Sequence, residues 1–178
     1  MRTTLSGFSF RPDRRNIGAM KPISRLPGKT TDITARRVLV IAPHADDDVL
    51  GCGGLLARLA ANGAEIHVLF LTDSSGGDEV TEHQQAYAER RHHEARAALE
   101  LLGIRDIEHL DLPDGRLDQF MSLAAGAIEH ELLNLRPDLL LAVSPLEVTS
   151  DHQAAFAALH RTLSGLRGGT PLDEAVAG

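Results

Sequence analysis

The 178 residues are 43% hydrophobic and 24% charged, a balance typical of one globular domain, and no stretch approaches the 18 consecutive apolar residues of a membrane span. A single cysteine, Cys52, excludes an internal disulfide framework and indicates a reducing cytoplasm. The net charge of −7 divides into +5 for residues 1–35 and −12 for the rest, so the acidic body excludes nucleic acid as a partner.

Residues 1–34 are rich in Arg, Pro, Gly and Ser and lack the apolar run of a secretory signal. They predict a disordered basic leader, although Met20 is an alternative start of the chain. Hydrophobic patterning begins at residue 35 and predicts one α/β domain over residues 35–163. The Gly-rich residues 164–178 read as a flexible tail.

Within that domain, short β-branched apolar runs alternate with segments of helical periodicity. The expected strands cover residues 36–43, 65–72, 107–110 and 139–143, and the expected helices cover residues 51–63, 82–102, 117–135 and 153–163. Gly63 and Gly103 are the expected stops of the first two helices. This alternation predicts a mostly parallel sheet with helices on both faces, whose ligands bind beyond the carboxyl ends of the strands.

A cluster of charged side chains follows the first strand, where His44, Asp46, Asp47 and Asp48 stand within five residues. Three adjacent carboxylates are costly unless something positive neutralises them, and a helix N-terminus stabilises only about one. The cluster predicts either a divalent metal site or a solvated acidic helix cap.

A second pair, Asp151 and His152, follows the fourth strand and reaches the same edge of the sheet. Two histidines and one carboxylate are a recognised zinc set, and a carboxylate beside the ion can accept the proton of an attacking water. Asp46 is placed for that second role. The alternative is that His152 is an ordinary surface histidine.

These motifs resemble those of the PIG-L/LmbE-like N-deacetylase family. PHADDDVLGCGG is similar to the family's His-Pro-Asp-Asp-Glu motif and Gly-rich helix start, and LFLTDSSGG to its strand ending in Thr-Asp. The run from Arg91 to Glu94 resembles its Arg-x-x-Glu helix, LDLPDGRL its next turn, and residues 145–152 its late Asp-His motif. The matches run in order over residues 36–160.

The resemblance implies a Rossmann-like three-layer αβα fold and hydrolysis of an N-acetyl group, often on an N-acetylglucosamine-containing small molecule or glycoconjugate. It implies one Zn²⁺ per chain, with His44, Asp47 and His152 as ligands and Asp46 as general base. Asp151 would orient an imidazole. Because aromatic residues are only 3% of the chain, hydrogen-bonding groups would have to select a sugar. The candidates for contacts with the substrate are Arg91, Asp114, Arg116 and Thr149. The other interpretation of Arg91 is an exposed helix arginine paired with Glu94 or Glu89.

Four features depart from the family pattern. Ala45 and Asp48 replace a Pro and a Glu, and both are expected to be tolerated because neither position is assigned as a ligand. Thr149 stands where the family has a histidine that stabilises the oxyanion or protonates the leaving amine, and loss of such a group costs about 10²–10⁴ in rate. Family members also continue for several tens of residues beyond this point, so the chain is naturally short, truncated, or complete only as a homo-oligomer. The alternative function is therefore a catalytically impaired metal- or ligand-binding remnant.

The remaining polar residues carry weaker signals. The glycines at 51–54 lack the spacing of a dinucleotide-binding loop. We expect Cys52 to be a packed small residue rather than a reactive thiolate. His67 and His109 lie in strands and are expected to be structural, while His130 and His160 are expected on helix surfaces. A histidine near residues 91–93 is a possible substitute for the missing one at position 149.

Overall fold

The computed structural model describes residues 33–77 and 83–168 of the chain. Most of the predicted leader, the expected first residue of the second helix and the last ten residues of the predicted tail lie outside these ranges. The described residues from Thr34 onward belong to one compact unit.

A four-stranded sheet with the order β3-β2-β1-β4 lies at the centre of this unit, and every pair of neighbouring strands is parallel. The strands are β1 (Arg37–Ala42), β2 (Glu65–Thr72), β3 (Asp106–Leu112) and β4 (Leu139–Ala142). The helices are α1 (Asp47–Ala61), α2 (Gln84–Leu101), α3 (Met121–Leu135) and α4 (Ser150–Gly168), with short 3₁₀ turns η1 (Ser75–Gly77) and η3 (Leu117–Phe120). The predicted mostly parallel α/β fold is confirmed.

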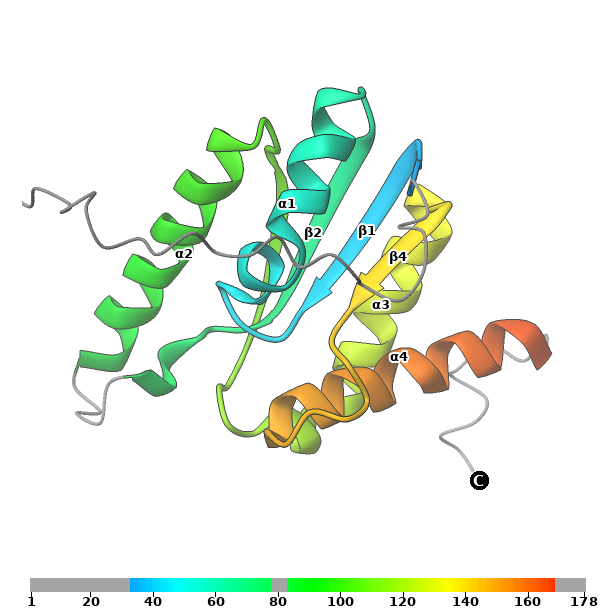
Figure 1. The fold of residues 1–178 in the computed structure, drawn as a ribbon. Helices are drawn as coiled ribbons and strands as arrows, with labels where there is room; N and C mark the ends of the chain where they lie inside the picture. The colour runs from blue at the N-terminus through cyan, green and yellow to red at the C-terminus, as the bar shows by residue number, and fades with distance from the viewer. Residues whose placement is uncertain (1–32, 78–82, 169–178) are drawn as a thin grey trace, which may run out of the picture. The chain divides into compact units, whose positions relative to one another are not determined.

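Alternate residues of the strands pack against helices on opposite faces, which gives the expected three layers (Figure 1). Val38 and Val40 of β1 join side chains of α1 and α2 in one cluster. Leu39 and Ile41 of the same strand join side chains of α3 and α4 in the other. Because both faces of β1 and β2 are buried, their sequences read as continuous apolar runs.

Several element boundaries differ from the predicted ones for identifiable reasons. The first helix begins at Asp47 rather than at residue 51, because carboxylates are favourable in a first helical turn. The edge strand β3 is longer than expected, since exposed Asp106 and Glu108 interrupt its apolar pattern. The expected single helix over 117–135 is η3 followed by α3, with a non-helical φ of −118° at Phe120. The last helix runs from Ser150 to Gly168, past the predicted end at residue 163.

The expected glycine stops are confirmed by the backbone, since Gly63 and Gly103 follow their helices at φ of +80° and +82°. Among the described residues, none of the helices combines the length and apolarity needed to cross a membrane.

Candidate metal centre

The end of β2 holds the loop that carries His44. The buried hydroxyl of Thr72 donates to the carbonyl of Pro43 at 2.8 Å, and the amide of Ala45 donates to the buried Ser74 Oγ at 2.9 Å. These bonds fix the backbone on both sides of His44. The imidazole therefore leaves the carboxyl end of β1 in a defined position.

Three side chains predicted as metal ligands come together at this edge of the sheet. Asp47 Oδ2 lies 3.4 Å from Nδ1 of His44 and 3.2 Å from Nε2 of His152. One donor atom from each of the three lies within 4.8 Å of the other two, and the two rings are 5.3 Å apart between centroids. Two ligands of a tetrahedral zinc ion are separated by about 3.3–3.6 Å, which is close to the two measured distances.

The other ring nitrogen of His44 faces two carboxylates. Its Nε2 lies 3.1 Å from Asp114 Oδ1 and 3.2 Å from Asp151 Oδ2. Asp151 is only 2% exposed and also accepts the backbone amides of Gly115 at 2.7 Å and Leu117 at 3.1 Å. A proton on Nε2 leaves Nδ1 as the free donor, an arrangement that metal-bound histidines commonly have.

Asp114 was expected to contact the substrate. In the structure its carboxylate lies against His44. Asp114 Oδ2 also accepts the amide of Gly76 at 2.9 Å. A Cβ atom at residue 76 would lie 3.0 Å from the Asp114 carboxyl group, so a larger residue there would push this carboxylate away from its present position. In the sequence, only the location of Asp114 at the carboxyl end of β3 indicated that it belongs to this site.

The electrostatics of the cluster favour a cation. Burial alone would lower the pKa of His44, but hydrogen bonds and charges from Asp114 and Asp47 raise that pKa to about 10. Burial alone would raise the pKa of Asp47, yet His44 and His152 lower it overall. The hydrogen bond from His44 likewise lowers the pKa of Asp114. The surrounding carboxylates thus favour positive charge at this position, and the donor set fits a divalent ion that would replace a proton on His44.

Asp46 stands outside the group of three donors. Its Oδ2 forms an ion pair with Arg91 Nη2 at 2.7 Å, and the other side of that guanidinium binds Glu94 at 2.8 Å. Nearly half of the Asp46 side chain remains exposed. Arg91 therefore holds the Asp46 side chain in place. It also forms the ion pair with Glu94 that was the other interpretation of Arg91 from the sequence.

The remaining sequence candidates contribute less to the cluster. Arg116 and Thr149 are exposed, and the carbonyl of Thr149 accepts the amide of Gln153 at the start of α4. His92 faces His109 and Asp111 rather than His44, and His93 is exposed. Neither of these two histidines takes the place of the one missing at position 149.

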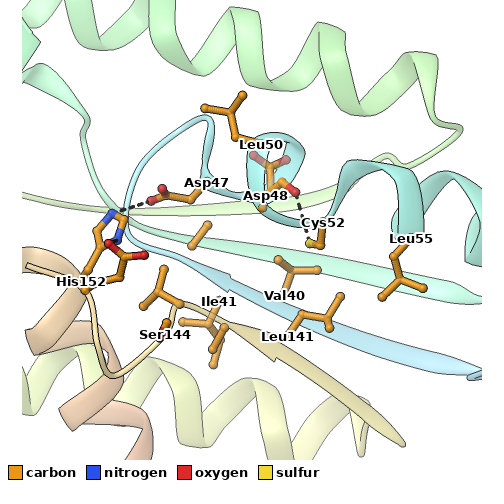
Figure 2. Close-up of a pocket in the computed structure, with 15 residues that line it drawn as sticks. Val40, Ile41, Asp47, Asp48, Leu50, Cys52, Leu55, Leu141, Ser144 and His152 are labelled. Atoms are coloured by element: carbon orange, nitrogen blue, oxygen red, sulfur yellow. Dashed lines mark hydrogen bonds and ion pairs between the residues drawn. The ribbon is translucent and has the colours of Figure 1, made fainter. Parts of the chain in front are cut away.

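A cavity of about 590 Å³ extends from the Asp47–His152 pair between α1 and the strands β1 and β4 (Figure 2). Its walls away from that pair are mainly apolar, with Leu55 and Leu141 at the far end. Asp48 also lines it and is 1% exposed, and within residues 33–77 and 83–168 neither of its carboxylate oxygens has a hydrogen-bond partner. Burial raises the pKa of Asp48 to about 6. Burial and the charge of Asp48 raise the pKa of Cys52 to about 11, so Cys52 is a packed thiol.

Replacing Asp48 with Asn is expected to stabilise the metal-free protein by about 1–3 kcal/mol at pH 7.5. At that pH the folded state contains a buried carboxylate that makes no hydrogen bond with the described residues, which raises its free energy. Asn has a similar size and removes the charge. Because the folded pKa is raised, the wild type loses stability as pH rises from about 3.8 through about 6. The gain should therefore shrink below pH 6 and vanish near pH 4, measured by urea unfolding in EDTA.

The matched control is Asp118→Asn, which removes an exposed carboxylate from η3. Its free energy of unfolding should stay within about 0.5 kcal/mol of the wild-type value, both at pH 7.5 and near pH 4. An Asp48→Asn protein no more stable than wild type at pH 7.5 would show that this carboxylate carries no buried charge.

Comparison with known proteins supports a relationship that spans most of the domain. Residues 39–163 match the PIG-L family, described as GlcNAc-PI de-N-acetylase. The chain is 39% identical over 128 residues to diacetylchitobiose deacetylase of Thermococcus kodakarensis, a match covering 67% of this chain and 46% of that enzyme. It is 34% identical over 141 residues to the 1D-myo-inositol 2-acetamido-2-deoxy-α-D-glucopyranoside deacetylase of Corynebacterium glutamicum, covering 64% of this chain and 47% of that one.

Among solved structures, N,N'-diacetylchitobiose deacetylase from Pyrococcus horikoshii superposes with a TM-score of 0.64 at 26% identity. The superposition covers 74% of this chain and 50% of that enzyme. The chain thus spans about half the length of these three relatives.

Proposed function

We propose, from the premise that this chain belongs to the PIG-L (GlcNAc-PI de-N-acetylase) family, that it hydrolyses an N-acetyl group on an N-acetylglucosamine-containing small molecule or glycoconjugate. The observation that carries the proposal is the meeting of His44, Asp47 and His152 donor atoms at the carboxyl edge of a parallel sheet. The activities for which the Thermococcus and Corynebacterium deacetylases are named support the substrate class. The single cysteine supports work in a reducing compartment such as the cytoplasm.

The three donors would hold one Zn²⁺ ion, since two imidazoles and a carboxylate are a common catalytic zinc set with an open fourth position. When bound, the ion would polarise the acetyl carbonyl and make water more acidic. Asp151 and Asp114 would hold the His44 ring through Nε2, so that its Nδ1 stays directed at Asp47.

The proton transfers would fall to Asp46. Its carboxylate is partly exposed at the edge of the site, and Arg91 holds it through a 2.7 Å ion pair. Asp46 would accept a proton from the attacking water and return it to the amine that leaves. The guanidinium would hold the Asp46 carboxylate in position at the edge of the site.

The cavity beside the site suits an acetyl group better than a second charged group. Its apolar walls, formed by residues such as Leu50 and Val143, would take the methyl, whereas the sugar hydroxyls would stay toward solvent. Arg116 and Thr149, exposed at the same edge, are the side chains left to contact the sugar.

The second candidate function is an impaired binding protein of the same family, and the exposed Thr149 favours it. Replacing Thr149 with His should raise kcat for acetate release from diacetylchitobiose about 10–100-fold, because it restores a general acid or oxyanion donor. The metal content should not change. The measurement is acetate released by the zinc-loaded proteins, with metal analysis on the same samples.

The control is Thr149→Asn, which keeps a polar side chain at the position but cannot donate a proton as an acid. Equal activity of wild type and Thr149→His would show that Asp46 carries both proton transfers. Zinc binding without acetate release in either protein would contradict the proposed activity and favour the binding protein.

A further inference from the structure

Two histidines outside the candidate metal centre occupy positions where the core would ordinarily have apolar residues. The buried stripe of α2 contains Ala88, Ala95 and Leu99, and His92 lies on it between the first two. On β3, His109 stacks against Phe70, with ring centroids 4.8 Å apart. The His92 and His109 rings face each other at 4.0 Å.

These rings carry polar atoms that make no hydrogen bond within the described part of the chain. Nε2 of His92 and both ring nitrogens of His109 are shielded from solvent and have no hydrogen-bond partner. Buried polar atoms without partners cost free energy and are rare in native proteins. A neutral imidazole has one nitrogen with a free lone pair, which can bind a metal ion.

A carboxylate completes the group. Asp111 Oδ1 lies 3.4 Å from Nε2 of His92, and donor atoms of His92, His109 and Asp111 all lie within 4.8 Å of one another. Ligand atoms on a tetrahedral ion are about 3.3–3.6 Å apart. His92 and Asp111 also line a cavity of about 400 Å³, which leaves room for an ion and a further ligand.

The backbone at Asp111 supports a particular placement of this side chain. Asp111 has a φ of +54°, and the register between β2 and β3 shifts between Phe70 and Thr72. Such irregularities usually redirect a side chain at the end of a strand. Here the Asp111 side chain, although 58% exposed, places its carboxylate beside His92 of α2.

We propose that His92, His109 and Asp111 form a second divalent metal site, separate from the His44–Asp47–His152 centre and specific for a Zn²⁺-like ion. The nitrogen and oxygen donors suit Zn²⁺ better than Mg²⁺ or Ca²⁺, which prefer oxygen alone. The ion satisfies the unpartnered ring nitrogens and links α2 to the end of β3. This proposed second site does not depend on the proposed deacetylase activity.

The test is the number of Zn²⁺ ions bound per chain after metal-free full-length protein is dialysed against buffered Zn²⁺. We expect two for wild type, one for His109→Phe, one for His152→Ala, and none for the double variant. Phe at position 109 keeps the stack on Phe70 and removes both donor nitrogens. The matched control is His93→Ala, which removes the exposed histidine next to His92 and should leave two ions bound.

Circular dichroism and the ion retained by His109→Phe verify that this variant is folded. If it is not folded, Asp111→Asn replaces it, since Asn tolerates a positive φ, and we expect the second ion to bind at least tenfold more weakly. One ion in wild type that is lost in His152→Ala but kept in His109→Phe overturns the second site. One ion lost only in His109→Phe instead overturns the deacetylase centre, and two ions in His109→Phe assign the second ion to other residues.

Discussion

The His152→Ala protein is expected to lose the ion held with His44 and Asp47 and to release acetate at least about 10³-fold more slowly than wild type. His152 supplies one of three donors, and its Nε2 lies 3.2 Å from the shared Asp47 oxygen. Without the ion, several kcal/mol of transition-state stabilisation are absent, which corresponds to this rate. Metal analysis and acetate release on one preparation measure both effects.

The control for this variant is His160→Ala, which removes an exposed histidine from the same helix, α4. It should retain wild-type metal content and activity. Full activity of His152→Ala after exhaustive treatment with a chelator would contradict the ligand assignment. Full activity of the wild type after the same treatment would contradict a metal-dependent reaction altogether.

Replacing Asp46 with Asn is expected to lower kcat about 10²–10⁴-fold while the metal content and KM change little. The amide keeps the shape of the side chain and a hydrogen bond to Arg91, but it cannot accept a proton from water. The variant should also lose the acidic limb of the pH–rate profile, because that limb reports protonation of the catalytic base. The measurement is acetate release between pH 4.5 and 9.

A structural role for Asp46 predicts a different outcome, in which the rate falls but the acidic limb persists. The matched control is Glu100→Gln, an exposed carboxylate of α2, for which kcat should not change. Loss of the ion in Asp46→Asn would place this residue among the ligands and leave the base unassigned.

The central strands were predicted well because strands that are buried on both faces have continuous apolar sequences. β2 begins and ends at the residues expected, since every position from Ile66 to Thr72 is buried. The edge strand β3 was predicted too short, because its exposed face tolerates Asp106 and Glu108. Helix starts were less certain, since Asp47 and Asp48 belong to α1 but resemble a loop in composition.

The candidate site was predicted as a set of residues but not as a set of contacts. Local patterning places His44 and His152 at the same edge of the sheet, and the parallel topology brings them together. Local patterning does not predict that Asp114 and Asp151 both contact the same nitrogen of His44. These contacts depend on the folding of loops that lie 70 and 107 residues away in the sequence. The family resemblance supplied the roles that spacing alone left open.

The polar groups buried without partners were also beyond sequence reasoning. His109 was expected to be structural, and nothing in its strand indicated that His92 of α2 would face it. Asp48 was expected to be a tolerable replacement for the family's Glu, but it lies in the cavity wall without a hydrogen-bond partner among the described residues. Both depend on the packing of α1 and α2 against the sheet, which is a property of the tertiary structure.

The most direct test of the central claim is the location of zinc in crystals of the zinc-loaded wild-type protein, from anomalous scattering on either side of the zinc edge. We predict a peak about 2.0–2.2 Å from Nδ1 of His44, a carboxylate oxygen of Asp47 and Nε2 of His152. Zinc-loaded crystals in which no peak lies among these three side chains, or in which the two rings turn away from Asp47, would contradict it.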